Sequence, residues 1–129
     1  MNKDMLTIVL VGAGGLIGAS SRYAVGRWVN DLAGNPNFPY GTLAVNVVGC
    51  LLIGVLGGLA ATRTVIGVDA RAFLVVGVLG GFTTFWAFGL EPIELIRRGE
   101  LFVGVTNVAL SVALSLVAVW AGLKIADSV

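Results

Sequence analysis

The chain contains no histidine, a single cysteine (Cys50) and few charged residues, and each shortage excludes a kind of function. Zinc or thiolate chemistry would lack its ligands. Serine, threonine and asparagine side chains are poor nucleophiles without a neighbouring base. The acidic residues fall near the ends of apolar stretches or between them, so no carboxylate lies at mid-membrane depth for proton coupling; they are Asp4, Asp31, Asp69, Glu91, Glu94, Glu100 and Asp127.

What the chain has in abundance is apolar sequence. Of its 129 residues 57% are hydrophobic and only 12% are charged. A membrane-spanning helix needs about 20 predominantly apolar residues, and four stretches meet that need. We therefore expect an all-α membrane protein with a single domain, residues 1–129, and helices at about 5–29, 40–62, 70–96 and 101–125. The first stretch is too long for the apolar core of a signal peptide, the competing interpretation.

The positive charges near the helix ends are balanced between the two sides of the membrane. One side carries Lys3, Arg63, Arg71 and Lys124, and the other carries Arg22, Arg27, Arg97 and Arg98. Lysine and arginine near helix ends normally decide the orientation of insertion. Balance predicts insertion in both orientations and an antiparallel homodimer with a two-fold axis in the membrane plane. A weakly biased single topology is the alternative.

The third stretch is interrupted by residues 80–89, Gly-Gly-Phe-Thr-Thr-Phe-Trp-Ala-Phe-Gly. Within the bilayer every backbone polar group must be satisfied, because hydrocarbon offers no hydrogen bonds. An irregular segment is tolerated there only where it is buried in protein or lines a water-filled path. We therefore expect a break in the third helix, and this break is the first candidate for an ion or solute site.

Small and polar residues recur every four positions in three stretches, which places them on one face of each predicted helix. The glycines of these rows indicate close helix packing, whereas the polar members favour a lined pathway over simple interhelical hydrogen bonding. Arg22 is compatible with an anion vestibule or with a side chain that reaches the membrane surface. The rows are Gly14, Gly18, Arg22 and Gly26; Thr42, Asn46, Cys50, Gly54 and Gly58; and Asn107, Ser111 and Ser115.

Together these residues suit a passive path for a small anion. The predicted path offers neutral hydrogen-bond donors and the electropositive ring edges of phenylalanines. No fixed carboxylate would repel the anion inside the membrane.

Two motifs resemble those of the Fluc/CrcB family of fluoride channels. They are residues 41–46 (Gly-Thr-Leu-Ala-Val-Asn) and residues 80–85 (Gly-Gly-Phe-Thr-Thr-Phe). Residues 18–22 (Gly-Ala-Ser-Ser-Arg) and the serine row of the fourth stretch extend the resemblance along the whole chain. Either motif alone is moderately specific, and the pair is specific.

The resemblance implies a dual-topology antiparallel homodimer in a prokaryotic inner membrane, with no enzymatic activity and no nucleic-acid partner. Such channels export fluoride passively and so relieve its toxicity. The resemblance also implies a structural sodium ion (Na+) at the dimer centre, held by the backbone carbonyls of Gly80 and Thr83 from both subunits. The implied ion pathway comprises Asn46, Phe85, Phe88, Asn107, Ser111 and Ser115; from the residue rows we add Thr42 to this path and Arg22 as the candidate for an anion vestibule.

The chain departs from the family pattern after Phe85. The family has small hydroxyl residues where this sequence has Trp86 and Ala87, and often a serine where it has Gly89. An indole beside the ring pair predicts either a narrowed pathway, which would make the chain a non-conducting variant, or packing at the dimer seam. Two other classes remain: a transporter of the small multidrug-resistance type, which needs a glutamate in the first span that is missing here, and a purely structural subunit.

Overall fold

The structure, a computed structural model, describes residues 1–35, 37–62 and 66–129. Arg63, which enters the charge count above, lies outside the described residues. The described chain is helical: α1 (Lys3–Ala33), α2 (Tyr40–Thr62), α3 (Val68–Arg71), the π-helical η1 (Ala72–Leu79), α4 (Gly80–Phe82), α5 (Trp86–Arg97) and α6 (Leu101–Ser128). Four spans are long and apolar enough to cross a membrane: Lys3–Ala33, Tyr40–Ala61, Val68–Arg97 and Leu101–Ser128. The expected all-helical class with four spans is confirmed, as is the interruption of the third.

The ends of α1 are fixed by local chemistry. Asn2 accepts a hydrogen bond from the Met5 amide at 2.8 Å and so caps the first turn. Gly34 ends the helix with a φ of 65°, a conformation that glycine adopts without steric cost. In the last turn the Asn30 side chain accepts a hydrogen bond from the Gly41 amide at 2.7 Å, which ties the end of α1 to the start of α2.

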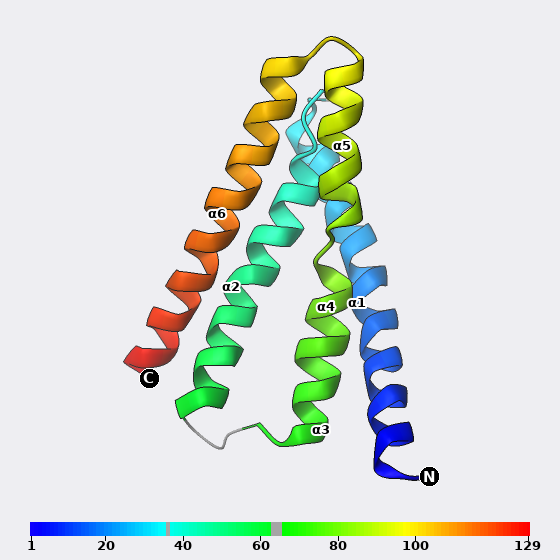
Figure 1. Cartoon of the computed structure of the whole chain (residues 1–129), viewed down its shortest axis with the longest axis vertical. Helices are drawn as coiled ribbons and strands as arrows, with labels where there is room; N and C mark the ends of the chain where they lie inside the picture. The colour runs from blue at the N-terminus through cyan, green and yellow to red at the C-terminus, as the bar shows by residue number, and fades with distance from the viewer. Residues whose placement is uncertain (36, 63–65) are drawn as a thin grey trace.

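The helices pack as two close pairs, α2 with α6 and α1 with the η1–α4 segment. Figure 1 shows the two pairs meeting near α5 and spreading apart toward the end where both termini lie. Glycine makes these approaches possible, as the sequence rows predict. A methyl group on Gly54 would collide with the Val119 carbonyl of α6, and one on Gly18 would collide with the Val78 carbonyl of η1.

The third span is interrupted in its helical hydrogen bonding. Its first half contains the π-helical segment η1, a geometry often found at functional sites. Between α4 and α5 the chain leaves the helix, and Thr83 takes an extended conformation with φ −80° and ψ 154°. The break coincides with the Gly-Gly-Phe-Thr-Thr-Phe motif and faces α2.

Candidate ion pathway

Asn46 of α2 bridges the break in the third span with two hydrogen bonds. Its Oδ1 accepts from the Thr84 amide at 2.7 Å, and its Nδ2 donates to the Thr84 carbonyl at 2.9 Å. One side-chain amide therefore satisfies both backbone groups of a non-helical residue, as hydrocarbon surroundings require. We call this reciprocal pair the Asn46–Thr84 clamp.

Beside the clamp lies a cavity of about 350 Å³, here called the ring cavity. Most of the predicted pathway residues meet there, from α2, α5 and α6. Three further polar residues, Cys50, Thr83 and Thr84, contribute to its wall. The predicted pathway residues that line it are Asn46, Phe85, Phe88, Ser111 and Ser115.

Phe85 and Phe88 form a ring pair in this cavity. Their centroids are 5.3 Å apart and the rings are inclined at 44°. Tilted rings expose hydrogen-bearing edges, which carry partial positive charge and attract anions. Phe85 is 80% exposed in the single chain, so the cavity is open on this side.

Asn107 lies outside the ring cavity but is joined to it through Ser111. It is only 2% exposed, and its Oδ1 accepts a hydrogen bond from the Ser111 hydroxyl at 3.2 Å. Its Nδ2 finds no acceptor among the described residues. A buried donor without a partner is costly, and the polar row on α6 thus retains one free donor next to Ser111.

Two predicted residues line a different cavity, of about 480 Å³, which we call the arginine cavity. Arg22 reaches it from α1 and Thr42 from α2. The Arg22 Nε donates to the Gly81 carbonyl at 3.1 Å, and the side chain is partly buried. Arg22 therefore points toward the backbone of the break.

Glu91, which the sequence analysis left at a span end, borders the arginine cavity. It lies in α5 within the Val68–Arg97 span, half-buried, and its Oε1 accepts a hydrogen bond from the Thr42 hydroxyl at 2.7 Å. Its Oε2 is buried without a partner among the described residues. The sequence held one signal for this contact. Glu91 lies six residues after Phe85, and α5 places that position facing α2.

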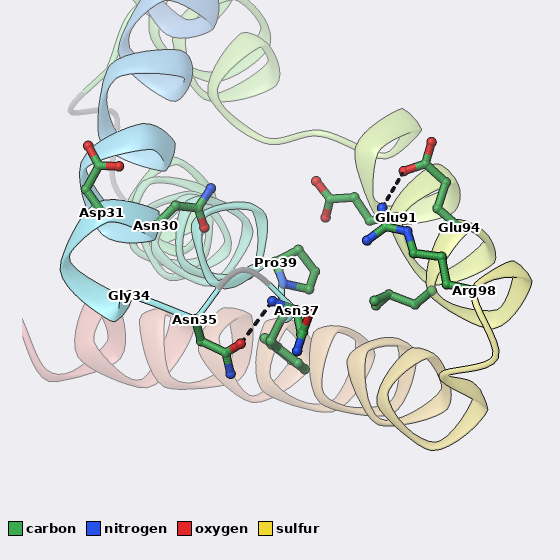
Figure 2. Close-up of a pocket in the computed structure, with 11 residues that line it drawn as sticks. Asn30, Asp31, Gly34, Asn35, Asn37, Pro39, Glu91, Glu94 and Arg98 are labelled. Carbon is green, nitrogen blue, oxygen red and sulfur yellow. Dashed lines mark hydrogen bonds and ion pairs between the residues drawn. The ribbon is translucent and has the colours of Figure 1, made fainter.

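A third cavity, of about 610 Å³, opens at the end of the bundle where the α1–α2 connection meets α5, and we call it the loop cavity. Figure 2 shows Glu91 and Glu94 of α5, with Arg98 directly after the helix, on the opposite side of this cavity from Asn30 at the end of α1. Arg98 pairs with Glu94 at 3.7 Å, an exposed contact of little energetic weight.

Trp86 and the ring pair line different cavities. The indole lines the arginine cavity with Arg22, whereas Phe85 and Phe88 line the ring cavity. Thr84 of the clamp borders both cavities. Successive residues at the start of α5 point in different directions, so the indole and the ring pair contribute to different cavities.

The break leaves two backbone carbonyls without partners in the described chain. In a continuous helix the Gly80 carbonyl would accept from the Thr84 amide, which is bonded to Asn46 instead. In a continuous helix the Thr83 carbonyl would accept from the Ala87 amide, but that amide faces the Thr84 hydroxyl at 3.5 Å. Carbonyl oxygens are the ligands that hard cations prefer, so Gly80 and Thr83 fit the sodium ion that the resemblance implied.

These features define a class: a multi-pass helical membrane protein with two cavities that meet at a broken third span. Comparison with known proteins then identifies the family. Residues 9–123 match the family described as CrcB-like protein, Camphor Resistance (CrcB), and the chain belongs to this family. The resemblance stated from the two motifs is confirmed.

Several curated relatives are similar along nearly the whole chain, and each is named a fluoride-specific ion channel, FluC. The Rhizobium etli protein is 51% identical over 121 residues, which cover 94% of this chain and 96% of the relative. The Agrobacterium fabrum protein is 50% identical over the same coverage. A protein from Clostridium novyi is 42% identical over 120 residues, 93% of each chain. All three names describe bacterial channels and not enzymes.

Proposed function

We propose that the chain is a fluoride-selective ion channel that exports fluoride passively across a bacterial inner membrane and so relieves fluoride toxicity. The ring cavity carries the proposal. It gathers the Phe85–Phe88 ring pair, the Asn46 amide and the hydroxyls of Ser111 and Ser115, and no carboxylate is among the described residues that line it. Ring edges and neutral donors can replace part of the water shell of a small anion without trapping it. The identity of the ion, fluoride, is taken from the names of the relatives.

The functional unit of this proposal is an antiparallel homodimer. The clamp region contains non-helical backbone within a membrane span, and such backbone does not face lipid. Phe85 and Trp86 at the break are 80% and 65% exposed in the single chain. A second copy covering the break would shield this backbone and close the open side of the ring cavity. The balanced charges favour a partner of opposite orientation.

A structural sodium ion at the centre of that dimer is part of the proposal. Gly80 and Thr83 would hold it through the carbonyls that the break leaves unpaired. Two subunits supply four such oxygens, a suitable ligand set for a hard cation. When bound, the ion supplies positive charge and joins the two breaks.

The main competitor is a transporter of the small multidrug-resistance type, which would need a carboxylate within the first span. The acidic residues of α1 are Asp4 and Asp31, one in its first turn and one near its end. A non-conducting variant is the second competitor, and the location of Trp86 outside the ring cavity argues against it.

Efflux from liposomes tests the proposal. Purified protein reconstituted into vesicles loaded with potassium fluoride should release fluoride, followed by an electrode, once valinomycin provides a counter-ion path. Vesicles loaded with chloride should release almost none. Well-folded dimers that release neither ion would refute the channel, and release of a cationic dye driven by a proton gradient would favour the transporter.

A further inference from the structure

Trp86 is the residue of this site whose role the proposed function does not explain. It lies in the first turn of α5 directly after the break, and its side chain is 65% exposed. The indole Nε1–H is a donor only, and it makes no hydrogen bond to any described residue. A large aromatic residue with a free donor, placed in a polar cavity, calls for a ligand that accepts hydrogen bonds.

The arginine cavity has two chemically different ends. Asp31, Glu91 and Asn30 border both this cavity and the loop cavity, so the carboxylates lie at the end that the two cavities share. Arg22, Trp86 and Thr84 border the arginine cavity but not the loop cavity. The end near the clamp is therefore rich in donors and poor in carboxylates.

The guanidinium of Arg22 is only partly used by the protein. Its Nε donates to the Gly81 carbonyl, which fixes the plane of the group, while its terminal nitrogens have no acceptor in the described part of the chain. No carboxylate among the described residues lies within ion-pair distance of it. A fixed cation with free N–H groups attracts an anion strongly when partly removed from water.

We infer that Trp86 and Arg22 form an outer anion site, in which the indole N–H and the guanidinium bind fluoride before it passes the Asn46–Thr84 clamp. Thr84 borders both the arginine cavity and the ring cavity, so an ion held at this end is separated from the ring pair by the clamp alone. This inference rests on the proposed function for its ion. Trp86 then acts as a residue that contacts the ion and not as a plug.

The first test removes the N–H and keeps an aromatic ring. In Trp86→Phe, the fluoride concentration for half-maximal efflux should rise about three- to tenfold, the factor expected for one hydrogen bond, with a smaller change in maximal rate. Half-saturation equal to that of the unchanged protein would overturn the inference. Faster efflux by Trp86→Ser would also overturn it, because that result would identify an obstruction.

The second test measures binding without transport. The variant Trp28→Phe/Trp120→Phe keeps Trp86 as the only tryptophan, and neither replaced residue lines the three cavities. Its emission should shift on titration with sodium fluoride at constant ionic strength, over the concentration range that half-saturates efflux. The matched variant Trp86→Phe/Trp120→Phe, which reports only Trp28, should not respond.

The two tests separate failure of the site from failure of the channel. Unchanged Trp86 emission in a protein that still conducts fluoride overturns the outer site and leaves the channel in place. A saturable shift in a protein that does not conduct supports the anion site and refutes the channel. An equal shift with sodium chloride over the same range would overturn the assignment to fluoride.

Discussion

At the scale of single residues, Asn46 bonds the backbone of the break and also lines the ring cavity, the proposed path. In Asn46→Asp, the acceptor for the Thr84 amide remains, but the donor is lost and a negative charge is added beside the ring pair. A charge about 4 Å from a passing anion costs roughly 4 kcal/mol at an effective dielectric constant near 20. We expect fluoride efflux from liposomes to fall by about two orders of magnitude or more.

A neutral substitution at Asn46 separates the effect of the added charge from the effect of losing the clamp hydrogen bonds. Asn46→Leu loses both clamp hydrogen bonds without adding charge, and size-exclusion chromatography monitors folding of both variants. If Asn46→Asp conducts as well as the unchanged protein, the Asn46 side chain does not face the ion. If Asn46→Leu is the more impaired of the two, the clamp matters more than electrostatic repulsion.

Cys50 offers a direct probe of the ring cavity because it lines that cavity and is the only cysteine. Silver ions or a small methanethiosulfonate reagent should reduce fluoride efflux by at least about half, since a thiolate formed in contact with water reacts. The matched variant Cys50→Ala should be insensitive. Full efflux from the unchanged protein after confirmed labelling would show that the ring cavity lies off the path.

At the scale of the helices, the close α2–α6 contact depends on glycines, because a residue without a side chain lets the two backbones approach. In Gly54→Ala, the added methyl group meets the Val119 carbonyl, and overpacking of this kind costs about 1–3 kcal/mol. The melting temperature in detergent should fall. Gly57→Ala is the matched control on the same helix, because nothing lies within 4 Å of its added methyl group, and it should melt at an equal or higher temperature. Equal loss of stability in both variants would show that helix flexibility matters and packing does not.

At the scale of the whole molecule, the balanced charges make a prediction about assembly. Arg97→Ser/Arg98→Ser removes positive charge from one side, and Lys3→Ser/Lys124→Ser removes it from the other. Each variant should insert mainly in one orientation and lose most of its fluoride efflux when expressed alone. Co-expression of the two should restore efflux, because an antiparallel dimer needs one copy of each orientation. Full activity of either variant alone would exclude the antiparallel dimer.

The membrane class and the four spans were determined by sequence alone. Apolar stretches of sufficient length have one physical solution in a bilayer, and the Gly-Gly-Phe-Thr-Thr-Phe motif inside the third stretch had to break it. The glycine rows also predicted which faces pack, because only residues without side chains allow such close approach. The rows placed Asn46, Ser111 and Ser115 on non-lipid faces, and the family resemblance added Phe85 and Phe88; the structure brings these five residues to the wall of the ring cavity.

Only the tertiary structure decided where the remaining side chains point. Trp86 is adjacent to Phe85 in sequence but borders the arginine cavity, and Glu91 reaches Thr42 across the α2–α5 contact. Both outcomes depend on the direction in which the chain leaves the break at Thr83. That direction is set by the Asn46–Thr84 clamp, a contact between residues 38 positions apart, and local periodicity holds no information on such a contact.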